Sequence, residues 1–214
     1  MAELERTERT TVKRLPARGS YERDVVHGIL DAGLVCHLGF VADGQPYVIP
    51  TVYVRVGDRL YVHGSAASRM LLAGRAGVPL CVTVTHLDGL VLARSAFHQS
   101  VNYRSVVILA TATEVVERAE KVAALQALVE RVAPGRWREV RPPTEQELKA
   151  TRVLVLPVSE ASAKVRTGGP LDDEADYALP CWAGVVPLRV TALPPVPDAR
   201  LTSSAPPPAV RPPS

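Results

Sequence analysis

Apolar and polar residues alternate through much of the chain, which is the pattern of strands with one buried face. Turn sequences such as ADGQ and VGD separate the runs, and a turn at Asp88 and Gly89 is expected to join two of them as a hairpin. About seven runs, with helices inserted rather than alternating, predict a mainly β fold, a closed or half-closed antiparallel barrel with peripheral helices. The predicted strands cover residues 34–41, 46–55, 59–63, 78–87, 90–97, 104–116, 152–158 and 183–190.

Apolar residues three and four positions apart predict the peripheral helices. Ser20 is placed to cap the first, in which Val25, Val26, Ile29, Leu30 and Leu34 share a face. Later helices are expected over residues 67–74, over residues 118–132, and from Thr144, where Glu147 completes a capping box.

Composition limits the function classes. Apolar residues make up 47% and charged residues 22% of the chain, which is typical of a globular protein, and no apolar run is long enough to cross a bilayer. The net charge of +3 is small and the cations are spread, so we expect no nucleic-acid partner and no membrane association. The first residues lack the apolar core of a secretory signal, so we expect a cytoplasmic protein with its three cysteines reduced.

The ends of the chain differ in composition from the middle. Residues 1–19 mix charged residues and Thr without an apolar period, which indicates a mobile arm or a strap across a partner. Residues 191–214 are rich in Pro, Ser and Ala and are expected to be disordered. The barrel domain is therefore expected over residues 20–190.

The stretch LYVHGSAASRML, residues 60–71, is the strongest chemical signal. A strand that ends at His63 and Gly64 and restarts as a helix presents free backbone N–H groups, and Ser65, Ser68 and Arg69 add donors that suit a phosphate. The alternative is a helix start that Ser65 merely caps, with Arg69 in solvent.

Three segments carry a resemblance to a known family: PYVIPTVYVRVGDRLYVHGSAASRM, NYRSVVILATATEV and CWAGVVPL. Over about residues 20–190 the chain resembles the flavin-binding split-barrel family of pyridoxamine 5'-phosphate oxidases and nitroimidazole-resistance reductases, and it is most similar to the nitroimidazole-resistance (Nim-like) branch. The resemblance implies a homodimer that binds FMN at its interface and transfers electrons between the reduced flavin and a small electrophilic substrate, such as a nitro-aromatic molecule.

The resemblance also implies roles for single residues. It puts Ser68 and Arg69 at the phosphate and His63 near the reactive edge of the flavin, as the candidate catalytic residue. A strand beside the isoalloxazine ring, a strand that approaches the flavin from the second subunit and a tryptophan that closes over the cofactor complete the set. These are Val48, Ile49, Pro50 and Thr51; Tyr103, Arg104 and Ser105; and Trp182, which precedes Gly184.

Other features keep alternatives open. No histidine follows the CWAG segment and Met70 follows Arg69, so the chain departs from the family's oxidase pattern, and we do not expect it to oxidise pyridoxamine phosphate. A haem, with His37 or His63 as ligand, or a deazaflavin could occupy the same barrel, and a non-catalytic flavin-binding module is a further alternative.

Lys164 and Arg166, before a glycine pair, are candidate substrate-binding residues. No metal site is expected in the acidic loop of residues 172–176.

Overall fold

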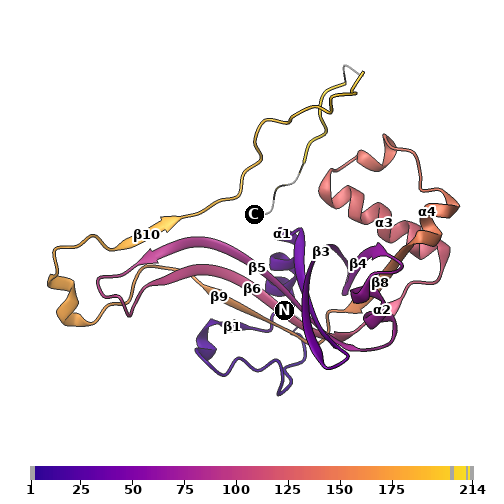
Figure 1. Cartoon of the computed structure of the whole chain (residues 1–214). Helices are drawn as coiled ribbons and strands as arrows, with labels where there is room; N and C mark the ends of the chain where they lie inside the picture. The colour runs from indigo at the N-terminus through magenta and orange to yellow at the C-terminus, as the bar shows by residue number, and fades with distance from the viewer. Residues whose placement is uncertain (1–2, 203–204, 211, 213–214) are drawn as a thin grey trace.

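The computed structural model describes residues 3–202, 205–210 and 212, and it forms one bent, largely antiparallel sheet with helices around it (Figure 1). Along the sheet the strands follow the order β1-β9-β6-β5-β2-β3-β4-β8-β7, and β10 pairs with β5. The two outermost strands of this order do not pair with each other, so the barrel is half-closed, as the sequence predicted. The strands are β1 (Gly19–Ser20), β2 (Val35–Ala42), β3 (Gln45–Val56), β4 (Arg59–Ser65), β5 (Pro79–Leu92), β6 (Ser100–Thr111), β7 (Thr113–Glu114), β8 (Thr151–Pro157), β9 (Ala161–Arg166) and β10 (Gly184–Pro187).

Strand β3 bends the sheet, because it pairs with different neighbours along its length. Its first part, residues 45–52, pairs with β2, and residues 53–56 pair with β4. The main core lies inside this bend, where helix α1 (Arg23–Ala32) packs Val26 and Leu30 against the strands. The buried hydroxyl of Tyr53 on β3 donates a hydrogen bond to the Leu30 carbonyl oxygen (2.5 Å), which ties α1 to the bend.

A second, smaller core lies on the other face of β3, β4 and β8. Helix α3 (Arg118–Val132) covers this face, with Ala124 and Leu128 packed against Val54, Tyr61 and Val153. Helix α3 has the bounds that its apolar period predicted. Helix α4 (Glu145–Ala150) follows with the expected capping box, in which Thr144 and Glu147 exchange hydrogen bonds.

Strand β5 is one long strand, which corrects the hairpin expected at Asp88 and Gly89. Its residues 79–91 pair with β6, and only a bulge between Leu87 and Gly89 marks the expected turn. Pairing with β2 involves Thr83 but no later residue of β5, and β9 pairs with β6 only as far as Tyr103, which lies opposite Leu87. Residues 88–92 therefore extend beyond the barrel by roughly 15 Å. We call β10, residues 88–92 of β5 and residues 100–102 of β6 the arm (Figure 1).

Two further expectations are corrected by the packing. Ser20 does not cap α1, since Glu22 is the N-cap and Ser20 accepts a hydrogen bond from its backbone N–H. His86, next to the turn expected at Asp88 and Gly89, is not in a loop but buried on β5, where its Nε2 lies 2.9 Å from the Ile29 carbonyl oxygen. Both errors arise because long-range packing, not the local turn signal, decides these positions.

The N-terminal segment lies against its own barrel. Leu4 and Thr10 are buried, and the Arg9 guanidinium pairs with the Glu160 carboxylate after β8 (2.5 Å). The segment therefore straps its own chain. Residues 191–202 contain no helix or strand and are exposed. Within the described ranges, no helix is long and apolar enough to cross a membrane.

Candidate functional site

The turn between β4 and helix α2 (Arg69–Arg75) is held in place by a neighbouring arginine. Arg152 on β8 donates a hydrogen bond to the Ala66 carbonyl oxygen (2.5 Å) and pairs with the Glu114 carboxylate (2.9 Å). Ser65 accepts a hydrogen bond from the Ala67 N–H through its hydroxyl (3.3 Å). Ser68 is the N-cap of α2, but its hydroxyl makes no capping hydrogen bond. The Ser68 hydroxyl is therefore available to a ligand.

Arg69 faces a hollow beside this turn. Its guanidinium lies 4.6 Å from the centroid of the Tyr47 ring, and it forms no ion pair with a carboxylate in the described part of the chain. The hollow has a volume of about 550 Å³, and Asp43 in the β2–β3 turn and Leu72 of α2 also line it. A planar cation on an aromatic face, without a carboxylate partner, suits an anionic ligand.

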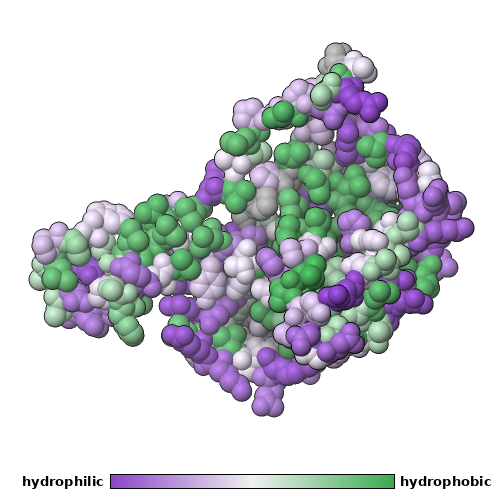
Figure 2. All heavy atoms as spheres, viewed as in Figure 1, coloured by the Kyte–Doolittle hydropathy of each residue, from purple (hydrophilic) through white to green (hydrophobic). Residues whose placement is uncertain are grey.

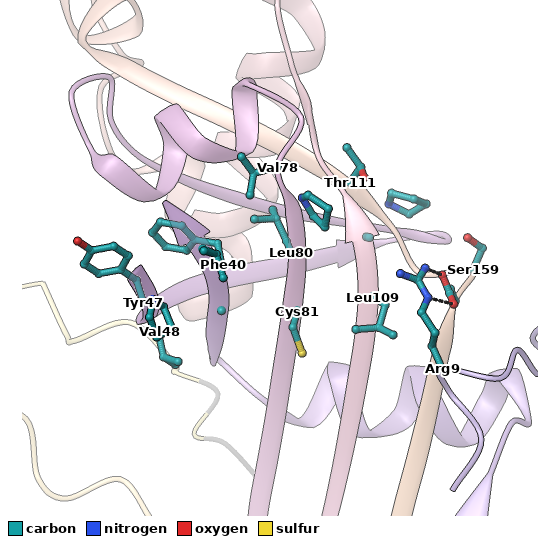
Figure 3. Close-up of a pocket in the computed structure, with 17 residues that line it drawn as sticks. Arg9, Phe40, Tyr47, Val48, Val78, Leu80, Cys81, Leu109, Thr111 and Ser159 are labelled. Atoms are coloured by element: carbon teal, nitrogen blue, oxygen red, sulfur yellow. Dashed lines mark hydrogen bonds and ion pairs between the residues drawn. The ribbon is translucent and has the colours of Figure 1, made fainter. Parts of the chain in front are cut away.

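A larger cavity of about 700 Å³ adjoins the hollow, because Val41 and Val78 line both (Figure 3). Its walls are mostly apolar, and the stacked rings of Phe40 and Tyr47, 5.4 Å apart, form one side. Val48 lines the cavity and is 65% exposed. Figure 3 shows Phe40, Tyr47 and Val48 on one side, Leu80 and Cys81 in the middle, and Leu109 and then Arg9 on the opposite side. The hollow and the cavity together join a cationic end to an apolar slot.

The remaining residues of the predicted ring strand lie next to Val48 on β3. Ile49 is 38% exposed, Pro50 is exposed and Thr51 is half-buried. Val48 pairs with Gly39 and Pro50 with His37 on β2, so this face of the sheet presents small and apolar residues to solvent, with exposed His37 among them. The structure therefore brings Arg69 and Val48 to one continuous concavity.

The predicted residues of the second flavin strand lie in or beside the arm, away from Arg69. Tyr103, Arg104 and Ser105 are on β6, and Arg104 donates two hydrogen bonds to the Asp88 carboxylate (2.8 and 2.9 Å). Trp182, before β10, is 65% exposed and packs its ring against Gly184. One chain does not bring these residues together with the turn after β4 (Figure 1).

Lys164 and Arg166, the predicted substrate-binding residues, make structural contacts on β9. The Lys164 ammonium donates to the Arg14 carbonyl oxygen (3.1 Å). Arg166 is 6% exposed and donates to the Gly168 and Gly169 carbonyl oxygens and to Asn102, while its Nε has no partner. Burial, and next to it the charge of Arg18, lower the pKa of Arg166.

His63 lies in a groove apart from the hollow beside Arg69. Leu60 and Val62 of β4 point into the main core, so the alternating residues Tyr61 and His63 point to the other face, under helix α3. The groove has a volume of about 760 Å³. Besides His63 it is lined by Val52, Leu125, Leu128, Val129, Val132, Ala133, Arg136, Trp137, Val140, Arg141, Pro143 and Glu147.

The His63 imidazole is in an apolar setting. Its Nδ1 is buried without a hydrogen-bond partner in the structure. Burial lowers the pKa of His63, so the neutral imidazole, with a nitrogen lone pair, is the form favoured at neutral pH. A buried nitrogen without a partner is costly in a folded protein, so a water or a ligand is expected to contact it.

Cations lie at the rim of the groove. Arg136 pairs with Glu139 (2.8 Å) and Arg141 pairs with Glu147 (2.6 Å), which lowers the pKa of Glu147 to about 2. The pattern of the sequence predicted helix 118–132 but did not indicate that it covers His63. No local signal could have done so, because the groove joins segments far apart in the chain.

Comparisons with known proteins agree with this fold. The family model described as pyridoxamine 5'-phosphate oxidase matches residues 22–165. The flavocytochrome Anf3 from Azotobacter vinelandii is 46% identical, with 94% of this chain and 93% of that chain covered and a TM-score of 0.89. A FAD and heme binding protein from Mycobacterium smegmatis is 37% identical, with 88% and 93% covered and a TM-score of 0.84.

A protein from Bacteroides thetaiotaomicron whose name describes it as a 5-nitroimidazole antibiotic resistance protein shares the fold. It is 19% identical, with 69% of this chain and 86% of that chain covered and a TM-score of 0.56. A search of curated proteins found no match.

The lowered pKa of His63 predicts a pH dependence of stability. In the unfolded chain His63 binds a proton near pH 6.5, whereas its pKa in the folded protein is lower. The free energy of unfolding therefore decreases as the pH falls below about 6.5. Replacement His63→Leu should make the urea midpoint fall less between pH 7 and pH 5. Exposed His37→Leu is the control and should follow the wild type. An unchanged pH slope in His63→Leu would contradict the burial of a neutral imidazole.

Proposed function

The chain belongs to the pyridoxamine 5'-phosphate oxidase family, and from this premise we propose that it is a dimeric electron-transfer protein that binds a flavin and a haem. The observation that carries the proposal is the presence of two separate concavities of different chemistry. One joins Arg69 to an apolar slot, and the other surrounds the buried, unpartnered nitrogen of His63.

The concavity at Arg69 fits a flavin nucleotide. The free Ser68 hydroxyl and the Arg69 guanidinium suit a phosphate, and Val48 with the neighbouring β3 residues forms an apolar wall for the ring. FMN is the nucleotide expected from the sequence. The name of the similar Mycobacterium smegmatis protein includes FAD, and the cavity of about 700 Å³ leaves room beyond the ring, so we propose FAD as the alternative nucleotide.

The groove at His63 fits a haem. Its walls are mostly apolar side chains and its volume is about 760 Å³. Arg136 and Arg141, which pair with Glu139 and Glu147 in the structure, also line it and are the cations that propionate carboxylates would need. Among the described residues that line the groove, His63 is the one whose side chain commonly ligates haem iron. The names of the two similar structures, a flavocytochrome and a FAD and heme binding protein, support this assignment. Exposed His37, on β2, lacks such surroundings.

The roles of the residues follow from these fits. Ser68 and Arg69 would bind the flavin phosphate, and Val48 would exclude water from one face of the ring. His63 would give its lone pair to the haem iron, while Leu125 and Leu128 keep the groove dry. The two cofactors, when bound, supply one-electron and two-electron chemistry that the side chains lack. His63 and Arg69, one in each site, are six positions apart in the chain.

The acceptor that we propose is a small electrophilic molecule, nitro-aromatic compounds included. The apolar cavity beside Val48 is open to solvent and large enough for such a molecule next to a flavin ring. His63 lies in the groove under α3, so it does not line the cavity proposed for the flavin ring. The candidate oxidoreductase activity thus depends on the cofactors rather than on a side-chain acid or base.

The dimer is proposed because one chain exposes apolar residues on a sheet face and on the arm, which a second copy would bury. The outer face of β3, β2 and β5 presents Val48, Pro50, Gly39 and Cys81, and Trp182 lies exposed beside the arm. Figure 2 shows apolar residues gathered on the arm as well. Exposed apolar surface of this extent is typical of an interface. In a dimer, Trp182 and Tyr103 of one copy could complete the flavin surroundings of the other.

The haem assignment predicts the spectrum of a single variant. Wild-type protein reconstituted with haem should show an intense Soret band, and His63→Ala should lose most of it because the iron loses its protein ligand. His37→Ala is the matched control and should keep the band. A Soret band of wild-type intensity and position in His63→Ala would reject the groove as the haem site.

The flavin assignment predicts a loss of affinity on removing one cation. Arg69→Ala should weaken flavin binding about 10- to 100-fold, which corresponds to about 1.5–3 kcal/mol for hydrogen bonds to a charged group. Flavin fluorescence titration measures this, and mass spectrometry of the released nucleotide distinguishes FMN from FAD. Arg75→Ala on the same helix, where Arg75 pairs with Glu114, should bind flavin normally. Equal affinities of the Arg69 and Arg75 variants would contradict the site.

The dimer predicts a hydrodynamic result. Sedimentation equilibrium of the flavin-loaded protein should give twice the chain mass of 23.0 kDa. Trp182→Ala should leave the dimer intact but lower flavin affinity, if Trp182 contacts the cofactor of the other copy. A monomer that retains flavin would refute the two-chain site.

A further inference from the structure

An unpaired group of cations lies at the edge of the sheet formed by β1 and β9. Lys13, Arg14, Arg18 and Lys164 form this group, which we call the basic edge. Gly19 of β1 pairs with Lys164 of β9, and the Lys164 ammonium donates to the Arg14 carbonyl oxygen (3.1 Å), so the four residues are neighbours. Figure 2 shows mostly hydrophilic residues on this part of the molecule, below the arm.

The basic edge is not neutralised by its own chain. None of its four cations forms an ion pair with a carboxylate of the described residues, whereas arginines elsewhere do, Arg9 and Arg94 among them. Lys13 and Arg14 are exposed, and Arg18 and Lys164 are half-buried. The Arg18 charge also lowers the pKa of buried Arg166. Like charges this close repel one another, and an acidic partner would relieve the repulsion.

An exposed apolar residue stands within the basic edge. Leu15 lies between Arg14 and the short helix η1 (Pro16–Arg18), and its side chain is 46% exposed. Its φ of 55° is in the left-handed region, which is uncommon for a residue other than glycine. Backbone of this kind persists where the surrounding structure fixes it, and it often marks a functional contact. An apolar contact inside a charged rim is the composition of a protein–protein interface.

The position of the basic edge relates it to the flavin. Strand β9 pairs with β6, so that Lys164 lies opposite Ser105 and Arg166 opposite Tyr103. The basic edge is therefore one strand spacing, about 4.8 Å, from the strand proposed to approach the flavin of the second copy. A partner bound there would bring its own redox centre close to that flavin.

We propose that the basic edge, with Leu15 at its centre, is the docking surface for an acidic one-electron carrier protein of the iron–sulfur class, which reduces the flavin. This inference rests on the proposed function. Two reduced carriers each give up one electron in turn and are oxidised, the flavin gains two electrons, and the accompanying protons come from water. Charge complementarity brings the carrier to the edge, and Leu15 supplies the apolar contact.

Stopped-flow reduction tests the proposal with plant-type ferredoxin, whose low potential suits flavin reduction. The probe is the reduced ferredoxin, mixed with the full-length, flavin-loaded protein. The second-order rate constant should fall about tenfold or more from low to high salt. The double variant Lys13→Glu with Arg14→Glu should lower it about tenfold at low salt, and Leu15→Ala should weaken binding without changing the salt dependence.

A matched control separates the basic edge from net charge. Lys149→Glu with Arg200→Glu changes the charge by the same amount at exposed positions away from the edge. This control should be reduced at the wild-type rate, and dithionite, a small reductant, should reduce all variants equally. Equal loss in the control pair, an unchanged rate in the edge variant, or equal loss with dithionite would each overturn the proposal.

A binding measurement distinguishes failure of this proposal from failure of the proposed function. Calorimetry with oxidised ferredoxin at low salt needs no electron transfer and no bound flavin. Binding that the edge variant abolishes supports the docking surface even if the purified chain lacks flavin. Absence of binding to wild-type protein, or preferential binding of a DNA duplex at the edge, overturns the docking surface while leaving the flavin and haem assignments untouched.

Discussion

Side chains alternate between the two faces of the sheet along β4, and this alternation decides which residues fill the main core and which face the groove under α3. Leu60 and Val62 fill the main core, while Tyr61 and His63 face helix α3. A shift of one residue in the pairing of β4 with β8 would bury His63 among aliphatic side chains and expose Val62. The register fixed by the pairs from Arg59 with Pro157 to Ser65 with Thr151 therefore underlies both concavities, because it also sets where the turn before Arg69 begins.

Much of the barrel followed from the sequence because strand period and turn chemistry are local properties. Strands β2, β3 and β4 and helix α3 are where the apolar pattern predicted them, and Thr144 caps α4 with Glu147 as expected. The hairpin at Asp88 and Gly89 was wrong because neighbours on both sides decide the path of β5. Strand β6 pairs along one edge and β10 along the other, so a bulge absorbs the turn signal.

The candidate sites were harder to predict for the same reason. Ser65, Ser68 and Arg69 are contiguous in sequence, and their shared turn could be identified from it. The surroundings of His63 come from residues 125–147, more than sixty positions away, and no period in the sequence connects the two. The sequence alone indicated that Arg104 and Arg166 could bind a ligand. In the structure Arg104 donates to the Asp88 carboxylate, and Arg166 donates to the carbonyl oxygens of Gly168 and Gly169.

The pairing of β10 with β5 has a consequence for the solubility of the chain. Gly184–Pro187 occupies the edge of β5 opposite β6, and Pro187 at its end has no N–H to offer a further strand. Without this short cover, the backbone of Gly89–Leu92 would present open hydrogen-bonding groups next to apolar side chains, which is a template for intermolecular β-sheet growth. Strand β10 thus protects the protruding sheet from self-association into fibrils, whatever its part in cofactor binding.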